Sequence, residues 1–415
     1  MYIIINPFKP GLPVPPGTFA GRINELKLLE RAIIQTSYFS PQNILIIGER
    51  GIGKTSVAYV SKAIAQDNFI SLVDKPQNPL ITIFVSVQKN TPSVIVLTRI
   101  IEELEEKLGQ YSSLITSAVG LLNAFIKKFK SVNVKGVQFE LGDGSLVTEQ
   151  EIYYEAKKTL RRCAEGCFNQ QDIHQRRSIC IIIDELDRMK DFDSFSSFWK
   201  SLQETLAADN INNLMLIMVG MPEIRELLAN DHESFLRTFT PIILDRMTES
   251  DAREVISKVL FNSGKTNTNE AVEKILLYSE RFPHLIQELG YSAYEVCSGD
   301  QIVETDIERG LHGTDNYLGS VKRLGELFFS RMYDEVKKSS NFKEVLKIVA
   351  NKSGENYNWV TRQEILKDFS LKKTSLDSAI RTLKDKKMLI KNPDAEGEYR
   401  LFSKMFQVFI GKLFD

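Results

Sequence analysis

The feature that most constrains the fold is a glycine-rich turn between an apolar run and a helix. Asn43–Ile47 is almost entirely apolar, which is typical of a parallel strand buried on both faces. The turn that follows, Gly48–Thr55, reads GERGIGKT and satisfies the pattern G-x-x-x-x-G-K-[ST]. A helix is predicted from Lys54 to about Gln66. Strand, turn and helix in this order predict a phosphate-binding loop in an α/β domain.

The residue types in this loop suit phosphate chemistry. Glycines let successive backbone N–H groups turn towards phosphate oxygens, and the positive end of the helix dipole faces the same anion. We expect Lys54 to contact the β- and γ-phosphates of ATP, and the Thr55 hydroxyl to ligate Mg²⁺. The predicted nucleotide-binding residues of the loop are Gly48, Glu49, Arg50, Gly51, Ile52, Gly53, Lys54, Thr55 and Ser56.

A second motif supplies the acidic groups that such a site needs. Ile179–Ile183 is an apolar run that ends in Asp184 and Glu185. We predict that Asp184 joins Thr55 in holding Mg²⁺, and that Glu185 polarises the attacking water as the catalytic base. Asp187 either assists or caps the following helix, and capping is the preferred interpretation.

Further apolar runs, Leu80–Val85 and Leu214–Val219, alternate with helical patterns at 23–34 and 153–167. This alternation predicts a P-loop NTPase core of three layers with a parallel sheet. A helical stretch at about 93–129 and a hairpin at 132–141 are predicted to form an insertion near 90–150.

The pattern changes to helices alone after the core, in segments near 249–261, 268–279, 283–297 and 303–311, with a connector at about 318–338. Three short helices (342–350, 361–369, 375–387) and two strands (388–391, 398–402) then predict a winged helix-turn-helix. The predicted organisation is an extended N-terminal arm at 1–17, an ATPase core at 18–247, a helical lid at 248–314, a connector at 315–340 and a winged helix at 341–415.

Composition limits where the protein works. The net charge is −1, but Lys and Arg exceed Asp and Glu by five within 341–415, which suggests a local basic surface. No apolar stretch is long enough to cross a membrane. Four cysteines in 415 residues indicate no disulfide framework and fit a reducing cytoplasm. A zinc site at Cys163, Cys167 and His174 would lack a fourth ligand, so two half-buried small residues are the preferred interpretation.

Together these motifs resemble the AAA+ branch of P-loop ATPases over nearly the whole chain. They look most like the archaeal-type and STAND ATPases with a C-terminal winged helix, which are similar to the Orc/Cdc6 initiators. Phe19–Arg22 matches an F-x-G-R box, which implies that Phe19 and Arg22 lie beside the adenine. Asp184–Arg188 matches the D-E-hydrophobic-D form of Walker B, and the segment that starts at Phe282 implies that Pro283 contacts the base.

The resemblance also implies an arginine finger and shows departures. Phe235-Leu-Arg237 resembles the segment that carries the finger, although Arg237 could equally be a surface arginine paired with a carboxylate. Gly220–Pro222 offers no polar side chain where a sensor residue often stands, Arg281 replaces a glycine, and His284 stands near the place of a sensor arginine. These departures predict nucleotide binding with slow turnover.

The presumed recognition helix of the tail is basic. The predicted buried stripe of this helix is Leu376, Ala379, Ile380 and Leu383. The aromatic residues of the tail are predicted to pack in a core, namely Phe402, Phe406, Phe409 and Phe414. Trp199 and Trp359 are predicted to lie in a core or an interface. The predicted DNA contacts, which suit phosphates, are Lys372, Lys373, Thr374, Arg381 and Lys384.

The favoured hypothesis is an ATP-dependent, DNA-associated switch that forms nucleotide-linked homo-oligomers, with Arg237 completing a neighbour's site. The alternative is a STAND-like signalling or antiviral-defence ATPase whose winged helix binds a protein partner. The basic recognition helix favours the first hypothesis, and the apolar Gly220–Pro222 segment favours the second. Fold analogy cannot choose between them.

Overall fold

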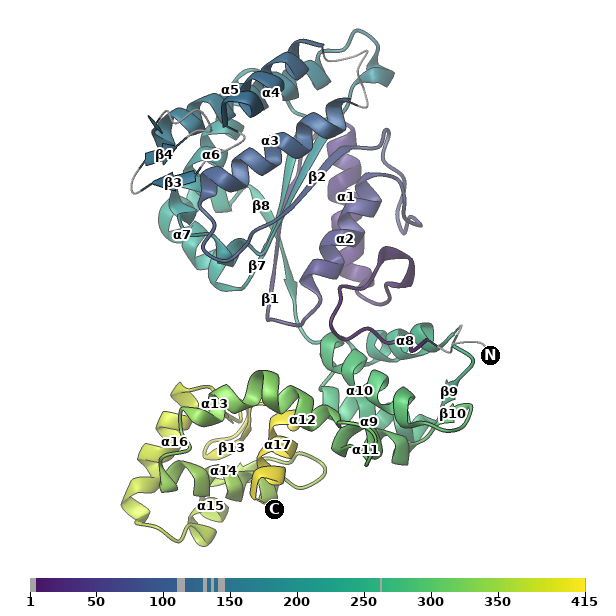
Figure 1. Cartoon of the computed structure of the whole chain (residues 1–415), viewed down its shortest axis with the longest axis vertical. Coiled ribbons are helices and arrows are strands. Elements are labelled where there is room, and N and C mark those ends of the chain that lie inside the picture. The colour runs from purple at the N-terminus through teal and green to yellow at the C-terminus, as the bar shows by residue number, and fades with distance from the viewer. Residues whose placement is uncertain are drawn as a thin grey trace. The chain divides into compact units, whose positions relative to one another are not determined.

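The chain divides into two compact units (Figure 1). The P-loop unit is Pro13–Asp245, and the C-terminal unit joins the residues up to Leu12 with Arg246–Asp415. The computed structural model describes residues 5–109, 116–129, 133–135, 138–140, 146–261 and 263–414.

A five-stranded parallel sheet forms the centre of the P-loop unit. Its strands lie in the order β2 (Ile81–Ser86), β6 (Ile179–Asp184), β7 (Leu214–Gly220), β1 (Asn43–Gly48) and β8 (Phe239–Leu244). Every residue of β1, β6 and β7 is buried, which explains why their sequences are continuous apolar runs. The predicted parallel sheet is therefore confirmed.

Helices cover both faces of this sheet, as Figure 1 shows. On one face lie α1 (Ile23–Ser37) and α2 (Lys54–Ala65), which pack on each other. The opposite layer contains α3 (Ser93–Gly109), α5 (Glu149–Phe168), α6 (Phe192–Ala208) and α7 (Glu223–Leu236). The three-layer α/β prediction holds.

The described part of the insertion near 90–150 contains two helices and three short strands. The predicted helical stretch contains two separate helices, α3 and α4 (Thr116–Phe129), which pack against each other. The predicted hairpin is present as β3 (Asn133–Lys135) and β4 (Gln138–Glu140), although its turn and outer ends lie outside the described residues. A third strand, β5 (Leu146–Val147), pairs with β4.

The cysteines are more deeply buried than predicted. Cys163 and Cys167 are fully buried in the core beside α6, not half-buried, because their helix is covered on that face. Burial raises the pKa of Cys167 to about 12, which keeps this thiol protonated at neutral pH. All four cysteines are unpaired, and no cluster of metal-binding residues occurs among the described residues. Trp199 is in the core, as predicted.

The C-terminal unit begins with four helices that match the predicted segments. They are α8 (Glu249–Leu260), α9 (Asn269–Ser279), α10 (Pro283–Val296) and α11 (Glu304–His312). A short parallel pair, β9 (Thr266–Asn267) and β10 (Gln301–Ile302), joins two of their loops. The predicted connector is α12 (Ser320–Leu324), a π-helical turn at Gly325–Phe329 and α13 (Ser330–Asp334).

The N-terminal arm lies along one face of α10. The Asn6 side chain donates to the carbonyl of Tyr291 (3.0 Å), and the Lys9 N–H donates to Gln287 Oε1 (2.9 Å). Between them the buried ring of Phe8 contacts Gly290, where a Cβ atom would lie 2.3 Å from Phe8 Cε1. An extended arm was predicted, and this packing explains the glycine in α10.

The last part of the chain combines helices with a small antiparallel sheet. Its helices are α14 (Ser340–Ser353), α15 (Arg362–Asp368), α16 (Leu376–Asp385) and α17 (Lys404–Phe414). Its sheet has the order β11 (Val360–Thr361), β13 (Glu398–Leu401) and β12 (Leu389–Lys391).

The side chains of this part largely follow prediction. The predicted apolar stripe of α16 is buried, and Phe406 and Phe409 are buried against Phe329. Phe402 and Phe414 are only half-buried. Trp359 is half-buried as well, and the Arg400 guanidinium lies 4.1 Å from its ring centroid. Across the described residues, no helix is long and apolar enough to cross a membrane.

A buried lysine joins α17 to the helices around it. Lys404 is 3% exposed, and its Nζ donates to the carbonyls of Gly354 (3.0 Å) and Glu355 (2.7 Å). Burial lowers the pKa of Lys404 to about 8, although the nearby carboxylates of Glu355, Glu308 and Glu280 oppose the shift. A neutral amine still has two hydrogens, which suffice for both carbonyls.

We predict that this lysine makes the protein more stable as pH rises from about 8 to 10. The unfolded chain, with an ordinary lysine pKa near 10.4, binds more protons over this range than the folded chain does, so stability increases with pH. Below pH 8 both states are protonated and the contribution is constant. Relative to Lys404→Met, wild-type protein should gain on the order of 1 kcal/mol between pH 7.5 and 9.5 in urea titrations. A constant difference between the two proteins would contradict the prediction.

Candidate nucleotide-binding site

The phosphate-binding loop connects β1 to α2 and depends on its glycines. Gly51 and Gly53 have φ angles of 81° and 97°, in the left-handed region that side chains disfavour. Gly48 packs against the end of β8, since a Cβ there would lie 2.6 Å from the carbonyl oxygen of Leu244. Gly51 and Gly53 are therefore required for their backbone conformation, and Gly48 for its close packing.

Lys54 lies across this loop. Its Nζ donates to the carbonyls of Gly48 (2.8 Å) and Glu49 (2.9 Å), and the Met221 sulfur lies 3.5 Å away. Burial lowers the pKa of Lys54, against the opposing influence of Asp187, Asp184 and Glu185. The cation is thus held at the loop by neutral oxygens, in the position from which it would meet phosphate.

Asp184 and Thr55 are brought together, as the sequence predicted. The Thr55 side chain hydrogen-bonds the Asp184 carboxylate, which is 1% exposed. Burial raises the pKa of Asp184, while this bond and the N–H of Glu185, 2.8 Å from Oδ1, lower it. A carboxylate and a hydroxyl are oxygen ligands of the kind that Mg²⁺ prefers, so these residues fit the ion.

Glu185 follows β6 and is held by two partners. Its backbone is left-handed (φ 59°), and its carboxylate pairs with Arg188 (2.8 Å). The Ser86 hydroxyl at the end of β2 donates to the other oxygen (3.3 Å). Sequence reasoning missed Ser86 and Arg188, although Ser86 follows a predicted strand and so had to lie at this edge of the sheet.

The capping role predicted for Asp187 is wrong. Its Oδ1 instead accepts the backbone N–H of Met221 at 3.0 Å, which ties the turn after β6 to the end of β7. The turn after β6 folds as a short 3₁₀ helix over Leu186–Arg188, and this turns the carboxylate towards β7. The apolar segment Gly220–Pro222 therefore takes part in the site through its backbone and a sulfur atom.

Comparison with known proteins agrees with this geometry. Residues 36–228 match the AAA domain family. This segment is an AAA-type P-loop ATPase domain. No match was found among curated proteins.

Solved structures are similar to the chain at low sequence identity, and the first of those below has a similar fold. The ORC2 protein of Aeropyrum pernix, in ADPNP–ADP complexes, is 12% identical, with a TM-score of 0.54 over 96% of this chain and 94% of that one. The Walker-type ATPase PABY2304 of Pyrococcus abyssi is 12% identical, with a TM-score of 0.48 over 92% and 95%. The ORC1 protein of Aeropyrum pernix, in complex with DNA, is 12% identical, with a TM-score of 0.45 over 95% and 93%.

Arg22 supports the phosphate-binding loop of the AAA domain through buried hydrogen bonds. It is 4% exposed, its backbone is left-handed (φ 60°), and its guanidinium reaches the carbonyls of Asp245 and Ile52 and the Glu25 carboxylate. Phe19 nearby is buried at 9% exposure. Contact of either residue with adenine stays a prediction.

The remaining loop residues differ in exposure. Ser56 is buried, and its hydroxyl accepts the N–H of Val14 (2.9 Å), so the extended lead-in is anchored to α2. Glu49 and Arg50 are exposed.

Arg237 lies near the amino-terminal ends of the strands, whereas the phosphate-binding loop of the AAA domain lies at their carboxyl ends. It precedes β8, whose first residue, Phe239, pairs with Asn43 at the start of β1, whereas the loop follows the end of β1. The five residue steps from one end of β1 to the other place these two ends of the sheet about 17 Å apart. The Arg237 side chain is 74% exposed and pairs with Glu233 (2.6 Å), so both readings of this arginine remain compatible with the structure.

Pro283 belongs to the C-terminal unit and is the first residue of α10. Arg281, which replaces the glycine expected there, adopts φ 64°, the conformation for which glycine is usually selected. The backbone shape of this segment therefore survives the substitution, and contact of Pro283 with the base stays a prediction.

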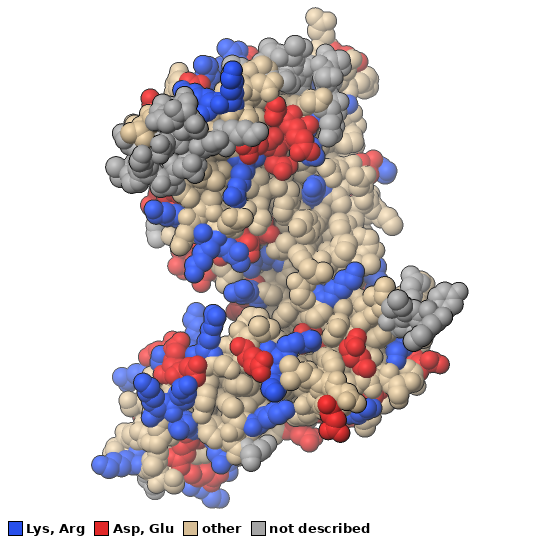
Figure 2. Space-filling model, in the orientation of Figure 1, with Lys and Arg blue, Asp and Glu red and all other residues tan. Residues whose placement is uncertain are grey.

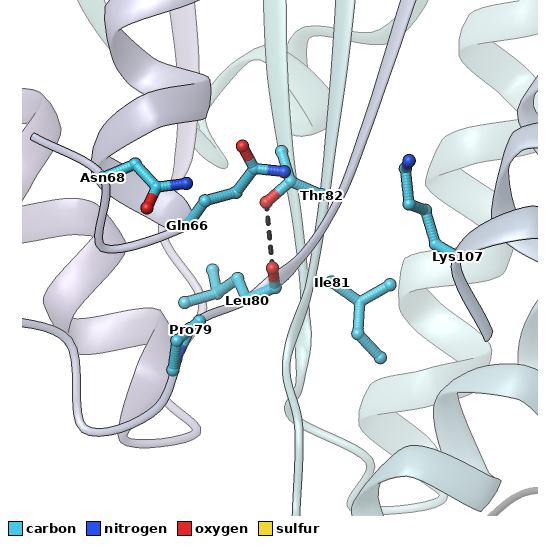
Figure 3. A pocket seen from close by; sticks show the side chains of 7 residues that line it. All are labelled: Gln66, Asn68, Pro79, Leu80, Ile81, Thr82 and Lys107. Atoms are coloured by element: carbon cyan, nitrogen blue, oxygen red, sulfur yellow. Dashed lines mark hydrogen bonds between the residues drawn. The ribbon is translucent and has the colours of Figure 1, made fainter. Parts of the chain in front are cut away.

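A separate cavity of 190 Å³ opens at the other edge of the AAA domain (Figure 3). It lies at the start of β2, where Thr82 Oγ1 donates to the carbonyl of Leu80 (3.0 Å), whereas the phosphate-binding loop and Asp184 follow strand ends. The cavity therefore is no part of the nucleotide site. Its lining residues are Gln66, Asn68, Pro79, Leu80, Ile81, Thr82 and Lys107.

We predict that Lys54→Ala weakens ATP·Mg binding tenfold to hundredfold. A charge-assisted contact of this kind contributes roughly 1.5–3 kcal/mol. Calorimetric titration of wild type and variant measures the difference. Lys62→Ala, a lysine substitution two turns further along α2, is the matched control and should bind as wild type does. Unchanged affinity in a folded Lys54→Ala protein would place the nucleotide elsewhere.

Proposed function

We propose that this protein is a magnesium-dependent ATP hydrolase that works as a slow, assembly-dependent molecular switch and acts on double-stranded DNA. The observation that carries the proposal is the convergence of Lys54, Thr55 and Asp184 at one edge of the sheet, with Glu185 beside them. These are a phosphate-binding cation, two magnesium ligands and a general base.

In this proposal each side chain has a separate task. Lys54 exchanges its carbonyl partners for the β- and γ-phosphates, while Thr55 and Asp184 hold Mg²⁺, which when bound neutralises phosphate charge. Glu185 orients and polarises the attacking water. The Glu185 carboxylate pairs with Arg188 through one oxygen and Ser86 through the other, and each oxygen keeps a lone pair that can accept the attacking water.

We also propose that a neighbouring subunit completes the site. Arg237 is exposed and too far from its own loop to act there, as the strand register requires. A neighbour could present the same arginine to the γ-phosphate through a head-to-tail interface. ATP would then favour assembly because it lies between subunits.

The C-terminal residues 341–415 are proposed to form the DNA-binding winged helix. Their order of three helices followed by a β-hairpin supports this, with α16 as the recognition helix. Lys372, Thr374 and Arg381 are exposed and Lys384 is half-buried, while the side chain of Lys373 lies outside the description. Figure 2 shows Lys and Arg side chains gathered over the α13–α16 end of the unit, with acidic residues among them.

The first test of the assembly uses mixed subunits. Arg237→Ala protein should bind ATP as wild type does but hydrolyse it poorly, and Glu185→Gln protein should do the same. Mixing the two should restore part of the hydrolysis, because one kind of interface carries both intact residues. Arg225→Ala, an exposed arginine on the same helix, is the control and should remain active alone. Absence of rescue in assemblies shown to be mixed by mass photometry would contradict action in trans.

The second test measures DNA affinity against salt. Each phosphate neutralised adds about −0.9 to the slope of log affinity against log salt, so three or four contacts give a slope near about −3. Lys372→Ala combined with Arg381→Ala should lower affinity similarly for all sequences and flatten the slope by nearly two. Lys27→Ala with Lys158→Ala, two exposed lysines of the P-loop unit, is the control. If ATP-bound protein leaves duplex DNA unbound at low salt in fluorescence anisotropy, the winged helix is a protein-docking module and the signalling alternative replaces this proposal.

A further inference from the structure

One arginine of the C-terminal unit lies against two aromatic rings and has no acceptor for its guanidinium. Arg400 belongs to β13, and its guanidinium carbon lies 4.1 Å from the ring centroid of Trp359 and 4.5 Å from that of Tyr357. Its Nε is buried and has no hydrogen-bond partner among the described residues. Native proteins rarely leave a buried charged donor in this state, because its lost hydration is not replaced.

The surrounding residues fix the orientation of this guanidinium. The antiparallel register of β11 and β13 places Trp359, the residue before β11, opposite Arg400. Tyr357 is 5% exposed, and its hydroxyl donates to the carbonyl of Leu401. Trp359 and Arg400 are half-buried. The arginine is therefore held in place before any ligand arrives, which lowers the entropy that binding costs.

Three other arginines stack on aromatic rings within the described ranges, and each of them has an oxygen acceptor. Arg246 donates to the Glu280 carboxylate at 2.8 Å. Arg323 donates through Nε to the Glu288 carboxylate, also at 2.8 Å. Arg176 donates to a backbone carbonyl at 3.1 Å. In this chain a stacked arginine thus pairs with an oxygen, most often a carboxylate, and the remaining one lacks it.

The charges near Arg400 favour one carboxylate over a row of phosphates. Side chains two residues apart on a strand share a face, so Glu398 lies on the same face of β13 as Arg400. Glu396, in the turn before this strand, is 97% exposed and pairs with Lys391 (3.5 Å). A nucleic acid backbone at Arg400 would bring further phosphates towards these acids, whereas a single carboxylate would not.

We propose that Arg400, with Trp359 and Tyr357, is a docking site for a protein segment that presents one Glu or Asp carboxylate between apolar residues. The carboxylate accepts hydrogen bonds from the guanidinium, and the apolar residues cover Trp359 and Ile390, which pairs with Arg400 in the register of β12 and β13. Tyr, Trp and Arg are also side chains that contribute strongly to protein–protein interfaces. This site goes beyond the proposed function, and it requires neither ATP hydrolysis nor DNA binding.

Nuclear magnetic resonance of the arginine Nε–H groups in full-length protein tests the proposal. The probes are blocked peptides Gly-Leu-Glu-Leu-Gly and Gly-Leu-Gln-Leu-Gly, and a third peptide with phosphoserine at the centre. We expect the Glu peptide to shift the Arg400 signal with a Kd on the order of 10 mM, since the contact is one charge-assisted pair. The Gln peptide should bind roughly tenfold more weakly because it lacks the charge. The signal of Arg323, which already has its carboxylate, is the internal control and should not move.

Two variants separate the guanidinium from the charge. Arg400→Gln should not bind the Glu peptide, and Arg400→Lys, which keeps the charge and the ring contact but loses the planar fork, should bind roughly fivefold more weakly than wild type. Arg362→Gln, which removes an arginine beside β11 that pairs with Asp377, is the matched control and should bind as wild type does. Circular dichroism checks folding, and Arg400→Lys serves alone if Arg400→Gln does not fold.

Three results would overturn the proposal. The first is an Arg400 signal that does not respond to the Glu peptide in wild type. The second is equal binding of the Glu and Gln peptides, or unchanged binding in a folded Arg400 variant. The third is tighter binding of the phosphoserine peptide than of the Glu peptide, which would make this a phosphate site.

Discussion

The pairing of β1 between β7 and β8 is the constraint on which the rest of the site depends. Because the sheet is parallel, the carboxyl ends of its strands share one edge, and both the phosphate-binding loop after β1 and the acids Asp184 and Glu185 at the end of β6 lie there. Gly48 can pack against Leu244 only because it has no side chain, and this close approach fixes where the phosphate-binding loop begins. Arg22 then reaches the carbonyls of Asp245 and Ile52, so the support of the loop depends on the same register.

The charges at this edge are balanced within the protein before a nucleotide binds. Lys54 lies near Asp184, Glu185 and Asp187, each of which stabilises its charged form, while burial opposes it. Each acid also has a neutral hydrogen-bond donor, from Thr55, Ser86 or the Met221 N–H. In the proposed complex, ATP with Mg²⁺ would supply both an anion and a cation, so these contacts would be exchanged without leaving an unpaired charge.

The sequence predicted the fold well wherever long patterns carry the information. Buried parallel strands such as β1 and β6 are continuous apolar runs, and helices such as α9 and α10 show helical spacing. The strand pairs β9–β10 and β11–β13 include two-residue strands that are too short to show any period. The strand contacts of Ser86 and Asp187 depend on which strands are neighbours, and sheet order is not a local property of sequence.

Two positions show how tertiary contacts override local reasoning. Cys163 and Cys167 are predicted to be half-buried small residues, but the adjoining layer covers that face of their helix and buries both fully. Arg281 replaces a glycine, yet the backbone keeps the left-handed shape, and its carbonyl accepts the N–H of Met247. In both cases the deciding contacts come from residues distant in the chain.

The same register that assembles the phosphate site excludes Arg237 from it. A parallel strand carries the chain from one edge of the sheet to the other, so a residue just before β8 and a loop just after β1 lie on opposite edges of one domain. Two copies arranged head to tail would bring these edges together, whereas a two-fold dimer would pair like with like. An arginine that acts on ATP from this position therefore requires a ring or a filament, and the strand register alone sets that requirement.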